Sequence, residues 1–404
     1  MKILFVLGFP NPFPGAAWTR IGFFAKDWSK KGHSVEVLGT FTYTTLQKRG
    51  SRKFSKVNIF NLIFHMDLNH PLVFTLNSII SFLVSTLFLL AKKPNITLVS
   101  VPTGDAGLGA LMACKLLRAK SVVDYRDEWE DYMTSLNNSR IGKFFYSAVK
   151  KIIASLYAKC HLIAAVTPNF MTALRRRGTT NVRLVPNGAD IGTFKPLSNK
   201  KENEGFTVFY SGGIAGYYRL DLAVKAVKKL IDKGAKNIKL IIAGGGEAQK
   251  VLNLAFEMGI SSNIEYKGVI NDKAKLAELI AKADTGLVPY DDNQLWKNSL
   301  PAKFFEYCAC GVPVIATVYA DSLLANYIRE YGIGVTSPPM DEEKLAKAIH
   351  WIYKNKPLRE AAGKGARALV QEKFDRNKIS SFFLSLIEQI VYGSGQNPEK
   401  NIKK

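Results

Sequence analysis

Short apolar runs alternate with longer amphipathic segments along most of this chain of 404 residues. Runs rich in Val, Ile and Leu predict strands, and segments with apolar residues three or four apart predict helices. In the first half we expect strands at 2–8, 34–39, 96–101, 120–125, 162–166 and 182–185. We expect helices there at 19–31, 72–91, 105–118 and 141–159. This alternation predicts an α/β fold with parallel sheets.

The same alternation restarts after a turn, which predicts a second domain. The string at 185–190, Val-Pro-Asn-Gly-Ala-Asp, contains a proline and an Asn-Gly pair, and both are strong turn signals. Further strands are expected near 206–211, 238–243, 264–267, 285–288, 313–317 and 333–335. The predicted organisation is an N-terminal domain, a C-terminal domain, a final helix and a disordered tail, at 1–190, 191–374, 375–392 and 393–404.

Two segments of the first half depart from the simple alternation. Residues 41–58 are polar and contain five Lys and Arg, so we expect a mobile loop. Residues 72–91 carry no charge and, at about twenty residues, are long enough to span a bilayer. Small polar residues nevertheless recur there at helical spacing, namely Thr75, Ser78, Ser81, Ser85 and Thr86. This polar face favours a buried or peripheral helix.

The formal net charge of +23 is unevenly distributed along the chain. Residues 1–190 hold 25 Lys and Arg against 10 Asp and Glu, whereas residues 191–404 hold 31 against 23. Such an excess fits nucleic acid, an anionic membrane or anionic substrates. The sequence has no aromatic residues interleaved with Lys and Arg on a platform, so we expect no nucleic-acid partner.

Residues 141–159 predict how a basic first domain would meet an anionic membrane. The segment interleaves apolar and basic residues, namely Phe144, Phe145, Val149, Ile152, Ile153 and Leu156 with Lys143, Lys150, Lys151 and Lys159. Such a helix can bury an apolar stripe at the level of the lipid headgroups. The alternative is that this stripe packs against the first sheet and leaves the lysines in water.

Cysteine content and the N-terminus bear on the compartment. None of the four cysteines forms a Cys-x-x-Cys pair, which favours a reducing compartment over a disulfide framework or a zinc site. The apolar start at residues 1–7 runs directly into Gly8-Phe9-Pro10 without a small-residue cleavage site, so it predicts a buried strand rather than a signal peptide. We therefore expect a cytoplasmic protein.

The most informative segment is 298–317, Asn-Ser-Leu-Pro-Ala-Lys-Phe-Phe-Glu-Tyr-Cys-Ala-Cys-Gly-Val-Pro-Val-Ile-Ala-Thr. Free backbone N–H groups at a helix start favour phosphate, and here they are those of Asn298, Ser299 and Leu300. Lys303 adds a positive charge about one turn later. Glu306 can accept two hydrogen bonds from a vicinal diol such as a ribose. These groups together suit a sugar nucleotide.

This segment resembles the donor-binding signature of retaining family 4 glycosyltransferases. That family often has two glutamates seven residues apart, followed by Tyr-x-Ala-x-Gly-x-Pro-Val. Here Glu306 occupies the second acidic position and Asn298 the first, which is a departure because an amide carries no charge. The resemblance covers nearly the whole chain and implies the GT-B architecture, in which two Rossmann-like domains face a cleft. It also implies that the final helix crosses back to the first domain.

A glycine-rich loop at 210–219 resembles the family's diphosphate-binding loop. Family members often place Arg at the position of Gly213 and Lys six residues later, where this chain has Arg219. We expect Arg219 and Lys303 to bind the departing diphosphate together. The string at 266–269 resembles the loop that meets the nucleotide base through its backbone, which makes Val269 a donor contact.

Two further strings in the first domain resemble family motifs. Gly15, with Arg20 after it, fits the loop and helix start that meet the diphosphate from the other domain. The string at 124–129 resembles Asp-x-Arg-Asp-x-Trp-Pro of a subgroup that builds bacterial surface polysaccharides. Arg126 can anchor a sugar hydroxyl or phosphate but cannot act as a base, and Asp127 is a candidate for holding the donor sugar or acceptor hydroxyl.

The sequence thus favours a retaining glycosyltransferase that uses a nucleotide sugar and a lipid-linked glycan acceptor at the inner face of the cell membrane. No Asp-x-Asp pair occupies a plausible position, because Asp291 and Asp292 are adjacent, so we expect neither metal nor cofactor. Two alternatives remain open: a GT-B nucleotide-sugar epimerase, and a non-catalytic basic binding protein.

Overall fold

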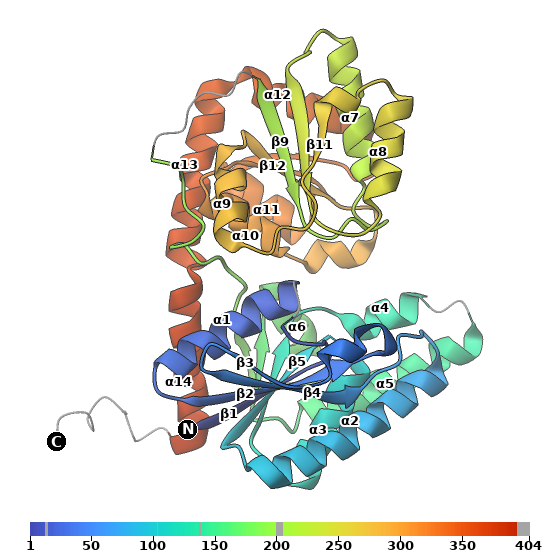
Figure 1. Cartoon of the computed structure of the whole chain (residues 1–404), viewed down its shortest axis with the longest axis vertical. Coiled ribbons are helices and arrows are strands. Elements are labelled where there is room, and N and C mark those ends of the chain that lie inside the picture. Colours follow the sequence, from blue (N-terminus) through green and yellow to red (C-terminus); the bar gives the residue numbers. More distant parts are fainter. Residues whose placement is uncertain (13–14, 103, 137–138, 199–204, 394–404) are drawn as a thin grey trace, which may run out of the picture. The chain divides into compact units, whose positions relative to one another are not determined.

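The protein forms two compact units. The computed structural model describes residues 1–12, 15–102, 104–136, 139–198 and 205–393. Unit 1 comprises Met1–Pro186 and the chain from Ser380 onward, and unit 2 comprises Asn187–Ile379 (Figure 1). The division falls inside the Pro-Asn-Gly turn. Helices cover a largely parallel sheet in unit 1 and a parallel sheet in unit 2, which confirms the predicted α/β fold class with two Rossmann-like units. The tail predicted to be disordered begins at 393, and its residues 394–404 lie outside the described ones.

Unit 1 contains an eight-stranded sheet in the order β3-β4-β2-β1-β5-β6-β7-β8 within the described residues. Its strands are β1 Lys2–Leu7, β2 Ser34–Phe41, β3 Gly50–Phe54, β4 Val57–Phe64, β5 Ile96–Val101, β6 Ser121–Tyr125, β7 Leu162–Ala165 and β8 Val182–Leu184. All six residues of β5 are buried, because a central parallel strand is covered on both faces.

The prediction of a mobile loop at 41–58 is wrong. These residues form a 3-10 segment, η1 Tyr43–Lys48, and the strand β3, which pairs antiparallel with β4. Strand β3 reads Gly-Ser-Arg-Lys-Phe and lies at the edge of the sheet. Charged side chains are common on edge strands because they discourage further pairing. An edge strand therefore lacks the apolar run by which the central strands were recognised, and its partner β4, although apolar, was not predicted either.

Seven helices accompany this sheet in the described part of the chain. They are α1 Ala16–Lys30, α2 Pro71–Lys92, α3 Gly104–Leu116, α4 Trp129–Leu136, α5 Arg140–Tyr157, α6 Pro168–Arg176 and α14 Arg376–Tyr392. Helix α14 is the predicted final helix, and from Ser380 onward it belongs to unit 1. Trp28 donates a hydrogen bond to Ser380 Oγ (2.9 Å) and packs edge-on against Phe383, so α14 is anchored on α1.

Unit 2 has a six-stranded parallel sheet in the order β11-β10-β9-β12-β13-β14. Its strands are β9 Phe206–Ser211, β10 Ile238–Ala243, β11 Ile264–Tyr266, β12 Thr285–Pro289, β13 Val314–Thr317 and β14 Gly334–Ser337. Its helical segments are α7 Leu220–Asp232, α8 Ala248–Glu257, η2 Ser261–Asn263, α9 Lys273–Lys282, η3 Gln294–Asn298, α10 Ala302–Ala309, α11 Leu323–Glu330, α12 Glu342–Lys354 and α13 Lys356–Lys373.

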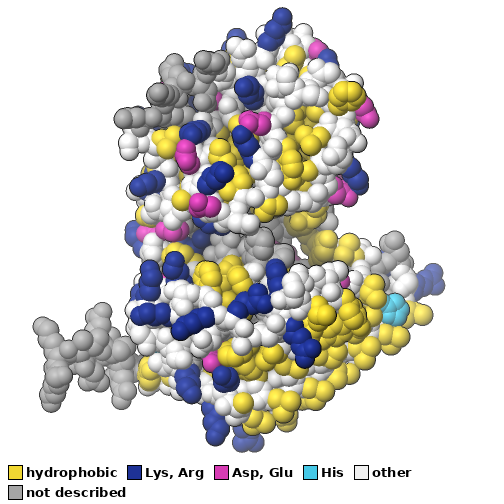
Figure 2. All heavy atoms as spheres, viewed as in Figure 1, with side chains coloured by type: hydrophobic (Ala, Val, Ile, Leu, Met, Phe, Trp, Pro, Cys, Tyr) yellow, Lys and Arg dark blue, Asp and Glu magenta, His cyan; other side chains and the backbone are white. Residues whose placement is uncertain are grey.

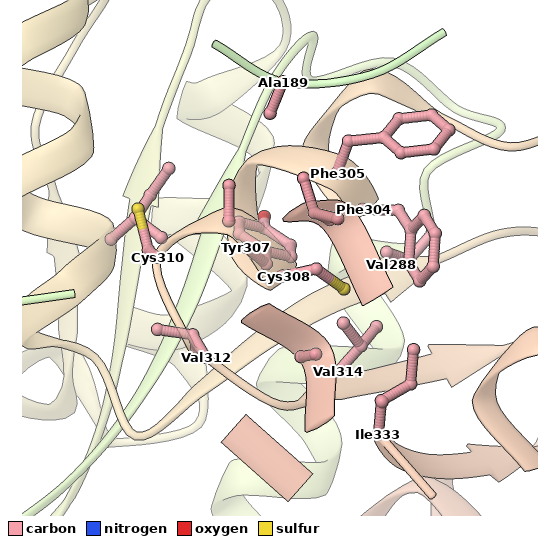
Figure 3. Packing of buried hydrophobic residues seen from close by; sticks show 14 of the residues in the cluster. Ala189, Val288, Phe304, Phe305, Tyr307, Cys308, Cys310, Val312, Val314 and Ile333 are labelled. Atoms are coloured by element: carbon pink, nitrogen blue, oxygen red, sulfur yellow. The ribbon is translucent and has the colours of Figure 1, made fainter. Parts of the chain in front are cut away.

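Helix α10, which carries the signature motif, is buried in the core of unit 2. Phe304, Phe305, Tyr307 and Cys308 are fully buried and pack among residues of β12, β13 and α13 (Figure 3). Cys308 and Cys310 are small buried residues of the same core. Since its apolar side chains are enclosed, α10 holds its polar residues in fixed positions.

Helix α5 differs from the expectation of one membrane-facing stripe at 141–159. Val149, Ile153 and Leu156 are buried and belong to the core of unit 1, whereas Phe144 and Ile152 are exposed. Half of the predicted stripe therefore packs against the protein itself. An amphipathic helix directs its widest apolar stripe to the core, and the periodicity alone did not separate that stripe from the residues beside it.

Candidate functional site

The site in unit 2 is built from loops at the carboxyl ends of parallel strands, where ligands bind in open α/β sheets. Backbone hydrogen bonds join the loops that follow β9, β10 and β11. Gly212 N–H donates to Ala243 C=O (2.9 Å), Ile214 N–H to Gly245 C=O (2.7 Å), and Gly244 N–H to Gly268 C=O (2.8 Å). These bonds fix the loops to one another.

Glycine is required where these loops cross. A Cβ added to Gly244 would lie 1.7 Å from Gly212 O, far inside contact distance. Gly244 also has a φ of +156°, and Gly212 a φ of +135°, values that favour glycine. The string at 243–246 thus forms a tight structural turn. Gly213 has open space above its Cα, so a ligand can approach the backbone there.

Lys303 lies directly beneath this loop. The residue is 5% exposed, and its Nζ has no hydrogen-bond partner among the described residues. The ammonium instead faces two aromatic rings, at 3.5 Å from the ring centroid of Tyr218 and 4.0 Å from that of Tyr210. A Cβ on Gly212 would come within 3.0 Å of Nζ. The glycine therefore lets the loop backbone pack closely against the buried ammonium.

The surroundings of Lys303 are ordered by aromatic stacking. Tyr218 stacks on Tyr290 with ring centroids 5.3 Å apart, and Tyr290 stacks on Trp296 at 5.1 Å. Tyr210 donates a hydrogen bond from its hydroxyl to Gly213 C=O. The ring faces that receive the ammonium are thus held in place by packing and by a hydrogen bond.

Burial lowers the pKa of Lys303 well below its ordinary value, and the nearby carboxylate of Glu306 only partly opposes this. A buried cation without a counter-ion is destabilising, because it has lost its water and gained no partner of opposite charge. An anion brought next to Nζ would restore the favourable charged state. This lysine is therefore poised to bind an anionic ligand.

The structure alters the expected role of the segment before α10. Asn298 is the last residue of η3, and Ser299 N–H already donates to Trp296 C=O (3.2 Å). The expectation of free N–H groups is therefore wrong for Ser299. Leu300 is buried, and the helix itself starts after Pro301. The first N–H groups of a helix have no intrahelical partner, so the amides open to an anion are expected in the first turn of α10, which begins at Ala302.

Glu306 lies one turn after Lys303 on the same helix. Its side chain is almost fully buried, and one carboxylate oxygen is 3.4 Å from Nζ of Lys273. The Lys273 side chain is 46% exposed, so this ion pair is open to solvent on the lysine side. A polar ligand can therefore compete with Lys273 for the carboxylate.

We expected Arg219 and Lys303 to bind the same diphosphate, but the Arg219 side chain is paired with other residues. Its guanidinium makes two bonds to the Asp221 carboxylate, at 2.8 and 2.6 Å, and contacts Met340 Sδ at 2.7 Å. The neighbouring residue Tyr218 covers Lys303 instead. An acidic residue two positions after Arg219 was the sequence signal for this pairing.

Val269 keeps a position compatible with its expected role. It follows Gly268 in the loop after β11, and its side chain is 56% exposed. A Cβ on Gly245 would meet its Cγ2 at 3.0 Å. The structure thus brings Gly213, Val269, Lys303 and Glu306 to loops and a helix start at one end of the sheet of unit 2.

Unit 1 has a buried polar network at the carboxyl end of β6. Arg20 Nη2 and Nε donate to Asp124 Oδ1 at 2.9 and 3.0 Å, and the same guanidinium donates to the carbonyls of Pro186 and Val185. Arg20 is 3% exposed. It therefore has a structural role, tying α1 to the segment that leaves unit 1, and the expectation that it meets a diphosphate is not supported.

Arg126 and Asp127 follow β6 but differ in environment. Arg126 is buried and donates to Ser100 Oγ (3.0 Å) and to Pro102 C=O (3.2 Å). Asp127 is exposed. Gly15 caps α1 in an extended conformation, and its carbonyl accepts the first turn's hydrogen bond from Thr19. Of these three, Asp127 offers the most accessible polar side chain.

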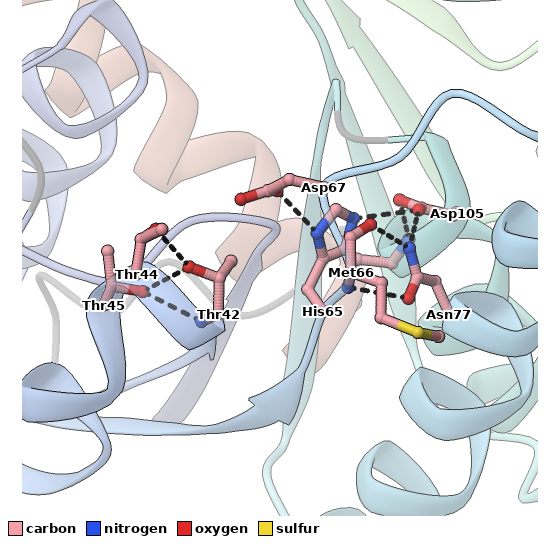
Figure 4. Close-up of polar contacts among 9 residues, drawn as sticks. Thr42, Thr44, Thr45, His65, Met66, Asp67, Asn77 and Asp105 are labelled. Atoms are coloured by element: carbon pink, nitrogen blue, oxygen red, sulfur yellow. Dashed lines mark hydrogen bonds and ion pairs between the residues drawn. The ribbon is translucent and has the colours of Figure 1, made fainter.

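A polar cluster in unit 1 was missed by the sequence reasoning. His65, at the end of β4, lies between two carboxylates, with Nε2 2.9 Å from Asp105 and Nδ1 3.1 Å from Asp67 (Figure 4). Asn77 donates to Asp105 (2.8 Å) and to the Met66 carbonyl, and its side-chain oxygen accepts a hydrogen bond from Met66 N–H. Burial alone would lower the pKa of His65, but the bonds to Asp105 and Asp67 outweigh it and raise that pKa. No spacing in the sequence connects these residues.

Among the described residues, no group of three or more His, Cys, Asp or Glu side chains is arranged to hold a metal ion. Metal independence stays a prediction, because a nucleotide diphosphate can itself supply ligands to a metal.

Solved structures share this fold. Sucrose-phosphate synthase from Thermosynechococcus elongatus superposes with a TM-score of 0.79 at 18% identity, covering 98% of this chain and 100% of that chain. HepE of Anabaena, in complex with UDP and glucose, superposes with a TM-score of 0.71 at 15% identity, covering 96% of this chain and 100% of that one. At these identities the likeness shows the fold.

Sequence comparison identifies relatives and families. The lipopolysaccharide glucosyltransferase WaaG of Escherichia coli K12 is 26% identical over 184 residues, which is 45% of this chain and 46% of WaaG. The match therefore spans about half the length of that relative. The family "Glycosyl transferases group 1" matches residues 193–369, and "Glycosyltransferase Family 4" matches residues 18–193. The two matches together run from residue 18 to residue 369, and the chain belongs to the family 4 glycosyltransferases of the GT-B fold.

Proposed function

We propose that this protein transfers a sugar from a nucleotide diphosphate sugar to a lipid-linked glycan acceptor, with retention of configuration and without a metal ion. The observation that carries the proposal is the buried ammonium of Lys303, which lies against the Gly212 loop and has no hydrogen-bond partner among the described residues. Glu306 lies one turn further along the same helix, within the family motif.

The chemistry follows from what glycosyl transfer needs. The bond between the sugar and the diphosphate lengthens, and negative charge grows on the departing oxygen. Lys303 and the first amides of α10 would stabilise that charge, as preorganised donors do in other enzymes. Glu306 would bind the ribose hydroxyls once Lys273 moves aside. Arg219 is a secondary contact, because it must first release Asp221.

The acceptor side is assigned to unit 1. Asp127 has an exposed carboxylate and is proposed to hold an acceptor or donor-sugar hydroxyl, while Arg126 positions the strand end beside it. A lipid-linked acceptor is supported by the relative that acts on lipopolysaccharide and by the basic charge of residues 1–190. The protein would then work peripherally at the cytoplasmic face of the cell membrane.

The first experiment is a calorimetric and thermal-shift panel of UDP, GDP, ADP and TDP sugars against the full chain. A specific donor should raise the melting temperature by mass action. Lys303→Met should abolish that shift, whereas Lys297→Met is the matched control, because Lys297 of η3 already pairs with Asp321. If no nucleotide sugar shifts the melting temperature, the proposal fails.

Turnover assays then separate the alternatives. With the donor from the panel and a membrane glycolipid extract, the anomeric configuration of the product, read by NMR, tests retention. Activity should persist in EDTA; loss that Mg²⁺ or Mn²⁺ restores would refute metal independence. Conversion of the nucleotide sugar to its epimer without acceptor would support an epimerase instead.

A further inference from the structure

Helix α2 buries small polar residues, together with Phe74, Phe88 and Leu89, and exposes a row of large apolar ones. Its buried side chains include Asn77, Ser78, Ser81 and Ser85. The opposite side is formed by six exposed residues that follow one another at intervals of three or four and are called the α2 stripe: Leu72, Leu76, Ile79, Leu83, Leu87 and Leu90. A helix that faces water normally directs such a stripe to the core.

Close packing against α3 explains why the inner face is small and polar. A Cβ on Gly109 of α3 would lie 2.3 Å from Ser78 O and 2.7 Å from Ser81 Cβ. Ser81 Oγ donates to Ala106 C=O at 2.7 Å. Small residues allow two helices to approach in this way. The serines therefore serve the α2–α3 contact, and that contact leaves the leucines outside.

The α2 stripe is long and largely uncovered. Its six residues are between 48% and 68% exposed, and Figure 2 shows a continuous hydrophobic band on the face where α2 lies. Phe74 of α2 meets Phe145 of α5, with ring centroids 5.9 Å apart. Next to Phe145, Phe144 is 78% exposed. An apolar surface of this extent marks an interaction site.

The charges around the stripe indicate what covers it. Helices α2, α3 and α5 carry six basic residues, namely Lys92, Lys115, Arg140, Lys143, Lys150 and Lys151. Their one acidic residue is Asp105, which is buried and bonded to His65. A two-fold dimer through this face would oppose like charges. An anionic bilayer instead offers apolar chains to the leucines and negative headgroups to the lysines.

We propose that the α2 stripe inserts into the interface of an anionic lipid bilayer, with α2 lying in the plane of the membrane. Helix α2 is long and apolar enough to cross a membrane by length and composition, and 39% of its apolar window is buried in the protein. Crossing would require α2 to leave α3 and the Phe60–Phe88 contact with β4. The in-plane arrangement keeps these contacts and covers the leucines.

This inference extends the lipid-linked acceptor proposed above, and it is tested without donor or acceptor. The full chain is sedimented with vesicles of phosphatidylcholine alone and of phosphatidylcholine mixed with phosphatidylglycerol, across a salt series. We expect binding to the mixed vesicles that weakens with salt. Leu76→Glu with Leu83→Glu should lower the partition coefficient by about tenfold or more. Phe256→Glu is the matched control, since Phe256 is 78% exposed on α8 of unit 2.

A second measurement does not depend on a charged variant folding correctly. The four native cysteines are buried, so Leu83→Cys can be labelled with an environment-sensitive fluorophore. The emission should shift to the blue with mixed vesicles, and the same label at Phe256→Cys should not respond. The proposal is overturned if the α2 substitutions leave vesicle binding at the wild-type level. It is also overturned if the emission of the label at residue 83 shows that the label stays in water. The proposal is also overturned if light scattering shows a dimer that Leu83→Glu dissociates and the protein does not bind vesicles. If vesicle binding fails while a UDP sugar still raises the melting temperature, the docking surface is refuted and the transferase proposal stands.

Discussion

Replacing Lys303 by methionine tests whether this lysine binds a ligand or stabilises the fold. Methionine keeps an unbranched side chain of similar length but removes the ammonium, which is 5% exposed and has no hydrogen-bond partner in the described structure. Each cation–π contact with a tyrosine ring stabilises the charged lysine by about 0.5–2 kcal/mol. Removing a buried ion from water costs several kcal/mol. The free protein should therefore become more stable without the charge.

The expected gain is at least about 1 kcal/mol, or about 2–4 °C in the melting temperature for a unit of this size. Donor binding should change in the opposite direction. Loss of a buried charge contact to a diphosphate costs about 2–4 kcal/mol, which weakens the affinity for the donor nucleotide by about 30-fold to 1,000-fold. Differential scanning calorimetry and isothermal titration calorimetry, with the nucleotide identified in the panel, measure the two effects on the same sample. A variant that melts earlier and binds that nucleotide as tightly as the wild type would refute the reasoning.

The same lysine gives a pH dependence with a defined sign. Burial puts its pKa well below the ordinary 10.5, so above that lowered pKa the free site has lost its proton. Stability of the free protein should then rise with pH through this window, because the unfolded lysine still holds its proton. UDP binding should take up a proton and weaken as the pH rises. Titration in two buffers of different ionisation enthalpy detects this uptake, and an absence of proton uptake would contradict the prediction.

Three further predictions rest on other residues. Glu306→Gln should weaken donor binding by about tenfold, since a charged hydrogen bond to a ribose hydroxyl is replaced by a neutral one, and an unchanged dissociation constant would remove the ribose assignment. Gly212→Ala should destabilise the protein by about 1–3 kcal/mol because its φ is +135°, and it should crowd Lys303; Gly216→Ala, with open space around it, is the control in thermal unfolding. His65→Gln should reshape the pH dependence of stability: the raised pKa of His65 contributes stability that is present below 6.5 and is lost as the pH rises through the folded-state pKa. The lowered pKa of Asp105 contributes stability that is present above 3.8 and is lost on acidification through its folded-state pKa. Melting curves between pH 3 and 9 should therefore show the largest loss on His65→Gln between about 4 and 6.5, and an equal loss at all pH values would argue against the pair.

Several features followed from the chain alone. Continuous apolar runs gave the central strands, because a strand covered on both faces needs apolar residues at every position. The Pro-Asn-Gly turn marked the place where the structure divides. The segment at 298–317 singled out Lys303 and Glu306, because spacing on one helix is a local property that the sequence fixes through the helical repeat.

Other features were decided only by the tertiary structure. The ammonium of Lys303 faces aromatic rings because Tyr210 and Tyr218, about ninety positions earlier in the sequence, are folded against it. Arg219 was expected beside Lys303 but pairs with Asp221. The edge strand β3 has no apolar signature. Helix α2 has polar and apolar faces that the sequence displays, yet the glycines of α3 determine that the serines face inward and the leucines outward. Periodicity specifies which residues share a face, whereas the neighbouring surface specifies which face is buried.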